Sequence, residues 1–306
     1  MKILVLGGTR FVGKALVDLI SSKDHEITIF TRGNRPAPPH VEHLKGDRSS
    51  PEALNLLKGR SFDVIADISG RTLADTESVL EQTGPPSHRF LYVSSAGVYA
   101  NTDFWPISEE TEIDSNSRHI GKFHTEEWLK DSGVPFTSFR PTYIYGPGNY
   151  NHIEKWFFNR IMNNRPIPLP GDGSLMTQLG HVNDLADAML TSLDFEVAKN
   201  RIYNCSSKQG VTLRGLVETA AKVCGKQSDQ IETFSFNPIG LDLKARKAFP
   251  LRIGHFFTDI NRITNELNWS PKYDLEKGLV DSFKNDYLLN QSNLIDFSLD
   301  KKLISS

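Results

Sequence analysis

Short apolar runs alternate along the first half of the chain with segments in which apolar residues recur at helical spacing. The runs are rich in Ile, Val, Phe and Thr and cover 3–6, 26–31, 62–68, 89–94 and 135–140. The segments with helical spacing cover 12–21, 51–58 and 72–82. Strands that alternate with helices are typical of a parallel sheet covered on both faces. The pattern therefore predicts an α/β fold with a doubly wound parallel sheet, whose ligands bind beyond the carboxyl ends of the strands.

The first apolar run leads into a glycine turn, in the sequence KILVLGGTRFVG. The turn needs a residue without Cβ at Gly7, and Gly13 lets the following helix approach the strand closely. The free N–H groups at the start of that helix attract anions, which suits the pyrophosphate of a dinucleotide. A strand–helix turn without a ligand is the alternative. If a cofactor binds, the residues that we expect to contact it here are Gly7, Thr9, Arg10, Phe11, Val12 and Gly13.

Two arginines stand where a dinucleotide-binding chain usually has other residues. Arg10 occupies the fourth position of the glycine pattern, and Arg32 ends the second strand, where Asp or Glu usually holds the ribose hydroxyls. Two guanidinium groups could bind a 2′-phosphate bidentately, so we expect NADP rather than NAD if a dinucleotide binds. A solvated turn residue is the alternative for Arg32. Asp47, which follows Gly46 after the next strand, is expected near the adenine.

The sequence pattern changes near residue 150. Helical spacing recurs at 150–165, 184–193 and 211–224, and two helices are expected within 259–288. We predict a dinucleotide-binding (Rossmann) domain over 1–148, completed by 174–200. A smaller C-terminal α/β domain of the substrate-binding type is predicted over 149–173 and 201–290, followed by a loose tail over 291–306.

Composition narrows the classes of partner. The 306 residues carry a net charge of −2, so nucleic-acid binding would need a local basic patch rather than a general basic field. Two cysteines, Cys205 and Cys224, are expected to be core residues in a reducing compartment. No apolar run approaches membrane-spanning length, and the first strand begins at residue 2, which leaves no room for a targeting peptide. We expect a cytoplasmic or already processed protein.

Several longer strings carry a family resemblance that extends over nearly the whole chain. They are GGTRFVG, VSSAGVY, SRHIGKFHTEEWL, RPTYIYGPGNYN, EKWFFNRI and QLGHVNDLA. The chain resembles the extended short-chain dehydrogenases/reductases, in their nucleotide-sugar epimerase/dehydratase branch. Within that branch it is similar to the chloroplast stem-loop-binding protein family and its bacterial relatives. The resemblance implies an RNA partner, a reported endoribonuclease activity, a homo-oligomer or ribosome and RNA-processing partners, and a bacterial cytoplasmic or plastid stromal location.

The resemblance also identifies a departure from the catalytic pattern of these reductases. Ser95 and Lys122 match the family's serine and lysine, and Ser94 and Lys122 match positions that contact the cofactor, but Arg118 stands at the position of the catalytic tyrosine. A guanidinium cannot accept a proton from a hydroxyl near neutral pH, so the usual proton relay is broken. Tyr99 or Tyr145 could serve as a relocated acid.

Three hypotheses about function follow from these residues. The first is an RNA-binding protein on a reductase scaffold, with or without ribonuclease activity. The second is an NADP-dependent nucleotide-sugar epimerase, dehydratase or reductase with a relocated acid. The third is a scaffold that binds a dinucleotide and does no chemistry. None of the histidines has metal-ligand spacing, and the need for a divalent metal stays open.

RNA contact would require cations combined with stacking aromatic side chains. One candidate segment runs from Lys155 to Arg160, although a helix that buries its aromatic face explains it more simply. The second candidate lacks a regular period and is the better patch. Its basic residues are Lys244, Arg246, Lys247 and Arg252. Arg252 also matches an arginine of the family's substrate pocket, whereas Thr177 and Gln178 replace the Arg-Asp pair that sugar-nucleotide enzymes usually have.

Overall fold

A computed structural model describes residues 1–290, 297–298, 300 and 303 of the chain. The chain forms two compact units. Unit 1 comprises Met1–Thr142, Val182–Ser206 and Thr258–Ser270, and unit 2 comprises Tyr143–His181, Ser207–Phe257 and Pro271–Ser306. No helix in the described part of the chain is long and apolar enough to cross a membrane.

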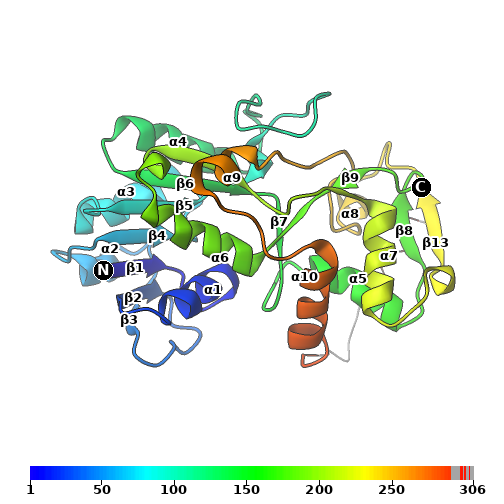
Figure 1. The fold of residues 1–306 in the computed structure, drawn as a ribbon, viewed down its shortest axis with the longest axis horizontal. Coiled ribbons are helices and arrows are strands. Elements are labelled where there is room, and N and C mark those ends of the chain that lie inside the picture. Colours follow the sequence, from blue (N-terminus) through cyan, green and yellow to red (C-terminus); the bar gives the residue numbers. More distant parts are fainter. Residues whose placement is uncertain (291–296, 299, 301–302, 304–306) are drawn as a thin grey trace. The chain divides into compact units, whose positions relative to one another are not determined.

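Unit 1 is built on a seven-stranded sheet in which every neighbouring pair of strands is parallel (Figure 1). The strand order is β11-β6-β5-β4-β1-β2-β3. Continuous apolar runs form the inner strands, such as β1, β4 and β5, because both faces of the sheet are buried there, whereas the edge strand β3 is polar and partly exposed. The strand bounds are β1 Lys2–Leu6, β2 Glu26–Thr31, β3 Glu42–Lys45, β4 Val64–Asp67, β5 Arg89–Val93, β6 Phe136–Pro141 and β11 Arg201–Cys205. The predicted doubly wound α/β fold is confirmed.

Helices cover both faces of this sheet. Side-chain caps fix two of their starts: Ser50 accepts from Ala53 N, and Thr72 forms a capping box with Asp75. The predicted helix over 51–58 is split, because a 3₁₀ turn follows a four-residue helix. The helices are α1 Phe11–Ile20, α2 Pro51–Leu54, α3 Leu73–Thr83, α4 Ile120–Asp131, α6 Val182–Thr191 and α9 Asn261–Leu267. The 3₁₀ turns are η1 Asn55–Leu57, η2 Ala96–Val98, η3 Ser192–Asp194 and η4 Glu196–Ala198.

Unit 2 packs helices around an aromatic core with three two-stranded sheets. Its buried side chains include Phe157, Phe158, Phe236, Phe249 and Phe283. The helices are α5 Ile153–Met162, α7 Leu213–Val223, α8 Leu243–Arg246 and α10 Leu275–Ser282, with a 3₁₀ turn η5 Ser228–Gln230 and a π turn η6 Phe283–Tyr287. The strand pairs are β7 Tyr143–Tyr145 with β10 Leu179–His181, β8 Ile167–Pro170 with β13 Thr233–Phe236, and β9 Met176–Thr177 with β12 Val211–Thr212.

Several segments lie elsewhere than the sequence pattern indicated. Residues 174–181 belong to unit 2 rather than to the Rossmann domain, and residues 258–270 belong to unit 1 rather than to the smaller domain. Strand β11 was assigned to the smaller domain, but it pairs with β6 over five residues and so extends the large sheet. The predicted loose tail falls partly outside the described residues. Among those that are described, Asp300 pairs with Arg160 and Leu303 is 1% exposed, so the tail is not loose at these positions. The Asp300 carboxylate, paired with the buried Arg160 guanidinium, and the buried Leu303 side chain fix this part of the tail to unit 2.

Candidate functional site

The glycine turn after β1 is as close-packed as backbone allows. A Cβ on Gly13 would lie 2.2 Å from the carbonyl oxygen of Gly7, and one on Gly8 would lie 2.6 Å from Cγ2 of Ile29. Gly7 itself has a φ of +109°, a conformation that L side chains rarely adopt. Helix α1 therefore starts directly against the end of β1. Arg10 precedes the helix and its side chain makes no capping hydrogen bond to it.

The polar residues predicted to contact a dinucleotide surround this turn in unit 1. Arg10 and Arg32 have exposed side chains, Thr9 is half-buried, and Phe11 and Val12 are buried. Phe11 has a φ of 45°, which places a non-glycine residue in the left-handed region at the first position of α1. The strain lies at the point where the helix N-terminus faces the turn.

Asp47 lies exposed after β3. Its carboxylate accepts hydrogen bonds from the backbone N–H and the hydroxyl of Ser49, and the backbone bond above all holds its pKa below the usual value. Asp47 is therefore ionised and available at the surface. Its predicted contact with adenine remains a prediction.

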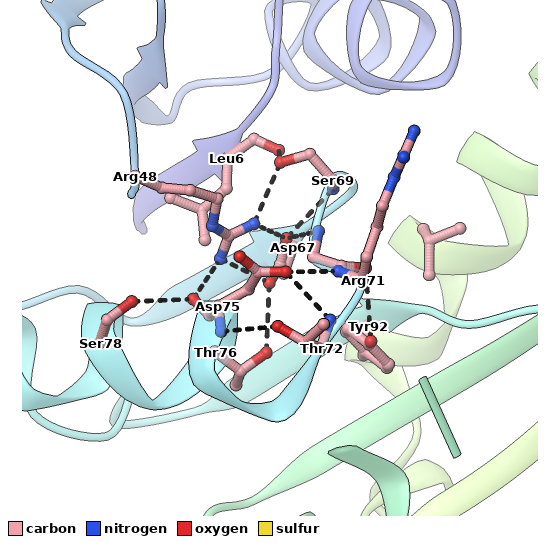
Figure 2. A network of polar contacts seen from close by, with 12 residues as sticks. Leu6, Arg48, Asp67, Ser69, Arg71, Thr72, Asp75, Thr76, Ser78 and Tyr92 are labelled. Carbon is pink, nitrogen blue, oxygen red and sulfur yellow. Dashed lines mark hydrogen bonds and ion pairs between the residues drawn. The ribbon is translucent and has the colours of Figure 1, made fainter. Parts of the chain in front are cut away.

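A buried ion pair that the sequence analysis missed lies at the carboxyl end of β4 (Figure 2). Asp67 is fully buried and receives Arg48 bidentately, with Nη1–Oδ1 and Nη2–Oδ2 distances of 2.8 and 2.9 Å. Arg48 also donates to Ser69 Oγ at 3.1 Å and to the Asp75 carbonyl at 2.6 Å. Burial opposes ionisation of Asp67, but the charge of Arg48 outweighs it and lowers the carboxyl pKa. The signal in the sequence that could have indicated this pair is Asp67 itself, a charged residue at the end of a buried strand.

This pair fixes the loop between β4 and α3. Asp67 accepts from the N–H of Gly70 at 2.8 Å, and Asp75 accepts from the N–H groups of Arg71 and Thr72 at 2.9 Å. The Arg71 side chain is exposed and extends away from the network (Figure 2). The loop presents the carbonyl oxygen of Gly70 to the neighbouring helix α4.

Lys122 on α4 donates a hydrogen bond to that carbonyl oxygen. Its Nζ donates to the oxygens of Gly70 and Val93 at 2.8 and 2.5 Å and lies 5.2 Å from the centroid of the Tyr92 ring. Burial lowers the Lys122 pKa to about 8, against the attraction of Asp67. The structure thus brings the family lysine to the ends of β4 and β5, where main-chain oxygens hold its ammonium group.

The two predicted serines follow β5 at the same edge. Ser94 is 3% exposed, and its hydroxyl has no hydrogen-bond partner among the residues that the structure describes. Ser95 caps η2 by accepting from Gly97 N at 3.0 Å. A buried hydroxyl without a partner among the described residues, at the same carboxyl edge of the sheet as the glycine turn before α1, fits a polar ligand such as a dinucleotide.

Arg118, which matches the tyrosine position of the reductases in sequence, lies next to His119 before α4. The Arg118 side chain is exposed, and its Nε donates to His119 Nε2 at 3.0 Å. The His119 ring packs on Gly97, where an added Cβ would lie 2.5 Å from the ring Cδ2 and 3.0 Å from Ser95 Oγ. An imidazole therefore lies beside Ser95, which the sequence analysis did not anticipate. The signal was Gly97 itself, which leaves room for that ring.

The tyrosines considered as relocated acids are core residues. The Tyr99 hydroxyl donates to Asn204 Oδ1 at 2.7 Å, and burial raises its pKa. The Tyr145 hydroxyl, in unit 2, donates to the carbonyl of Asp274 at 3.3 Å. Both side chains are at most 1% exposed, so neither phenol is placed to exchange a proton with a ligand.

In the better of the two predicted basic patches, some of the basic side chains interact with neighbouring groups of the protein. Arg246 donates to the carbonyls of Phe249 and Leu251 and so braces its own turn. Arg252 lies over the Phe256 ring at 4.3 Å, and Lys247 is exposed. The Lys244 side chain lies outside the described part of the chain. The patch thus retains Lys247 as its exposed cation within the described side chains.

Comparisons with known proteins agree on one family. The model of the NAD dependent epimerase/dehydratase family matches residues 3–206. The chain is 41% identical to the chloroplast stem-loop binding protein of 41 kDa b of Arabidopsis thaliana, over 94% of this chain and 79% of that protein. It is 23% identical to a putative UDP-glucose 4-epimerase of Methanocaldococcus jannaschii, over 90% and 95% of the two chains.

Solved structures share the fold. The UDP-glucose 4-epimerase of Thermotoga maritima with UDP-glucose superposes with a TM-score of 0.76 at 18% identity, covering 93% of this chain and 98% of that one. The dTDP-glucose 4,6-dehydratase of Bacillus anthracis in complex with NAD superposes with a TM-score of 0.75 at 22% identity, covering 95% and 97%.

Proposed function

The chain belongs to the NAD-dependent epimerase/dehydratase family, and on that premise we propose that it binds RNA and a nicotinamide dinucleotide without the family's usual proton relay. The observation that carries the proposal is Arg118. A permanently charged guanidinium stands at the tyrosine position, and Lys122, which would lower a phenol's pKa, has its ammonium on two main-chain oxygens instead. The name of the Arabidopsis relative supports RNA as the partner.

The dinucleotide would lie along the carboxyl edge of the unit 1 sheet. The β1–α1 turn would hold its pyrophosphate through helix N–H groups, and Ser94 and Lys122 would hold its nicotinamide half. A bound nicotinamide would supply hydride transfer. The exposed Arg32 favours a 2′-phosphate, although the family description and the Bacillus anthracis structure name NAD.

Fluorescence titration with NADPH and NADH tests the cofactor assignment. We expect NADPH to bind more tightly than NADH. Arg32→Ala should weaken NADPH binding about tenfold and so remove the preference, since a bidentate phosphate contact is lost. Arg35→Ala, which removes an exposed arginine three positions on, is the matched control. Equal affinity of the wild type for both cofactors would refute the assignment of Arg32.

Salt-dependent binding of an RNA hairpin tests the main proposal. Lys247→Gln should weaken binding to RNA hairpins of every sequence. It should also reduce the slope of the logarithm of the binding constant against the logarithm of salt concentration by about one, because one phosphate contact is lost. Lys23→Gln removes an exposed lysine in unit 1 and should leave binding unchanged. The proposal fails if purified protein binds no RNA, or if it turns over UDP-glucose with NAD⁺ or NADP⁺ in a reaction that Lys122→Ala abolishes.

One observation favours an oxidoreductase as the second candidate. The His119 imidazole lies against Gly97 beside Ser95, and its Nε2 accepts from Arg118, so the neutral ring carries its own proton on Nδ1. After release by Arg118, Nε2 could take the proton of a hydroxyl that Ser95 positions. Sugar-nucleotide turnover that His119→Asn abolishes and Arg118→Ala preserves would favour this candidate over the first.

A further inference from the structure

The described residues of the C-terminal segment make a specific contact with the end of helix α5 in unit 2. Asp300 Oδ1 lies 2.5 Å from Arg160 Nη2, and the Phe297 ring lies against two guanidinium groups, with Arg160 Cζ 5.4 Å and Arg165 Cζ 5.1 Å from its centroid. The Arg160 guanidinium also stacks on Trp156, with Cζ 3.5 Å from the ring centroid. We call this arrangement the tail contact.

The tail contact uses the chemistry by which proteins bind a nucleotide. Bases stack on aromatic rings and on guanidinium planes, and arginine pairs with phosphate oxygens. In the tail contact, the Phe297 ring lies near two guanidinium groups, and Asp300 is an oxyanion paired with one of them. An aromatic ring and an oxyanion, three residues apart, thus occupy the positions that a base and a phosphate would take.

Arg160 retains hydrogen-bonding capacity that the tail contact does not use. Its Nη1 donates to the Trp156 carbonyl at 3.1 Å and its Nη2 donates to Asp300, but its Nε is buried and has no partner within the described ranges. The residue is only 4% exposed. Most buried donors in proteins are paired, so the Arg160 Nε remains able to donate to a further acceptor.

We propose that Trp156, Arg160 and Arg165 form a binding site for one nucleotide of single-stranded RNA, and that Phe297 and Asp300 occupy this site while RNA is absent. The inference rests on the proposed RNA binding and adds its regulation. RNA must displace the tail contact, so its apparent affinity is reduced by the fraction of molecules in which the site is open. Lys155, on the same helix, is excluded from the site because it pairs with Asp286.

Fluorescence anisotropy with a labelled oligouridylate tests this competition in the full chain. Asp300→Asn removes the competing charge and should tighten binding about tenfold. Phe297→Ala leaves the ion pair intact and should also tighten binding, so a folding defect in one variant does not decide the outcome. Ser298→Ala changes an exposed residue between the two and should bind as the wild type does. Near-ultraviolet circular dichroism checks that each variant is folded.

A second substitution locates the gained affinity. Arg165→Ala in the Asp300→Asn background should return the RNA affinity to the wild-type value or below it, because a nucleotide bound in the vacated site loses one stacking plane. The inference is overturned if both tail variants bind as the wild type does, or if the gain survives Arg165→Ala. If neither the wild type nor any variant binds RNA, the proposed function itself fails, which is a distinct result.

Discussion

Two carboxylic acids are buried equally in the two units, but their pKa values shift in opposite directions. Asp67 in unit 1 is 0% exposed and Glu154 in unit 2 is 1% exposed. The pKa of Asp67 is lowered, whereas burial raises the pKa of Glu154 to about 7. Asp67 receives the guanidinium of Arg48, while Glu154 accepts from amide groups, Gly146 N at 3.2 Å and Asn149 Nδ2 at 2.8 Å.

The difference shows what keeps a buried carboxylate ionised. Neutral N–H donors stabilise the charge but do not compensate for the loss of water around it, whereas a full countercharge does. The edge of the unit 1 sheet can therefore hold an ionised carboxylate, an ammonium and a set of fixed carbonyls near neutral pH. The loop around Glu154 holds a carboxyl group that changes charge in the physiological range.

Removing the countercharge should have the largest effect. Arg48→Met leaves Asp67 buried without its partner, and we expect the free energy of unfolding to fall by about 3–5 kcal/mol. Urea unfolding measures it. Adding Asp67→Leu should recover much of the loss, because no buried charge then remains. Asp18→Asn, which breaks the exposed pair with Lys14, is the control and should change stability by less than about 0.5 kcal/mol.

The contrast also indicates what the sequence could predict. Apolar periodicity and the glycine turn predicted the sheet and α1, because these features depend on neighbours along the chain, whereas Ser95 and Lys122 came from the family resemblance. Arg48 and Asp67 are 19 residues apart and Arg160 and Asp300 are 140 apart, so no local pattern joins them. The basic patch was overestimated because Arg246 donates to its own backbone, which composition cannot show.

Stability should depend on pH through Glu154. Its folded-state pKa of about 7 exceeds the ordinary value of 4.5, so the folded state binds the proton more tightly. The stabilisation is complete below pH 4.5 and is lost as the pH rises to about 7, by up to about 3 kcal/mol at 1.36 kcal/mol per unit. Glu154→Gln should remove this fall between pH 5 and 7.5.

The pH dependence of stability must be compared between the wild type and Glu154→Gln because His181 also titrates in the folded state. Burial lowers its pKa to about 4, so it contributes stability that increases with pH up to its unfolded value near 6.5, opposite in sign to Glu154. The wild-type curve alone sums both contributions with those of other shifted groups, among them His43, whose pKa is lowered, and Glu109, whose pKa is raised. The difference between wild type and Glu154→Gln isolates the carboxyl group, and a flat difference would show that Glu154 is ionised throughout.

Removing one amide donor should have a smaller effect that depends on pH. Asn149→Leu deletes the 2.8 Å bond to Glu154 and should cost about 1–2 kcal/mol. Since that bond favours the ionised carboxylate, its loss should raise the Glu154 pKa further. We therefore expect a greater loss at pH 7.5 than at pH 5, measured by urea unfolding at both. An equal loss at the two pH values would mean that Asn149 acts through packing and its bonds to Ile144 O and Asn151 N, not through the charge of Glu154.

The smallest effect should come from the weakest donor to the paired carboxylate. Thr76 Oγ1 lies 3.4 Å from Asp67 Oδ2, whereas Ser138 Oγ lies 2.7 Å from Glu126 in the same unit. Glu126 is paired with Arg140 as Asp67 is paired with Arg48, so the two hydroxyl contacts differ mainly in length. Thr76→Val should therefore change the free energy of unfolding by about 0.5 kcal/mol or less, and Ser138→Ala by about 1–2 kcal/mol. If Thr76→Val costs as much as Ser138→Ala, the long Thr76 contact stabilises Asp67 as much as a short hydrogen bond would, and Arg48 would not be the only group that keeps Asp67 ionised.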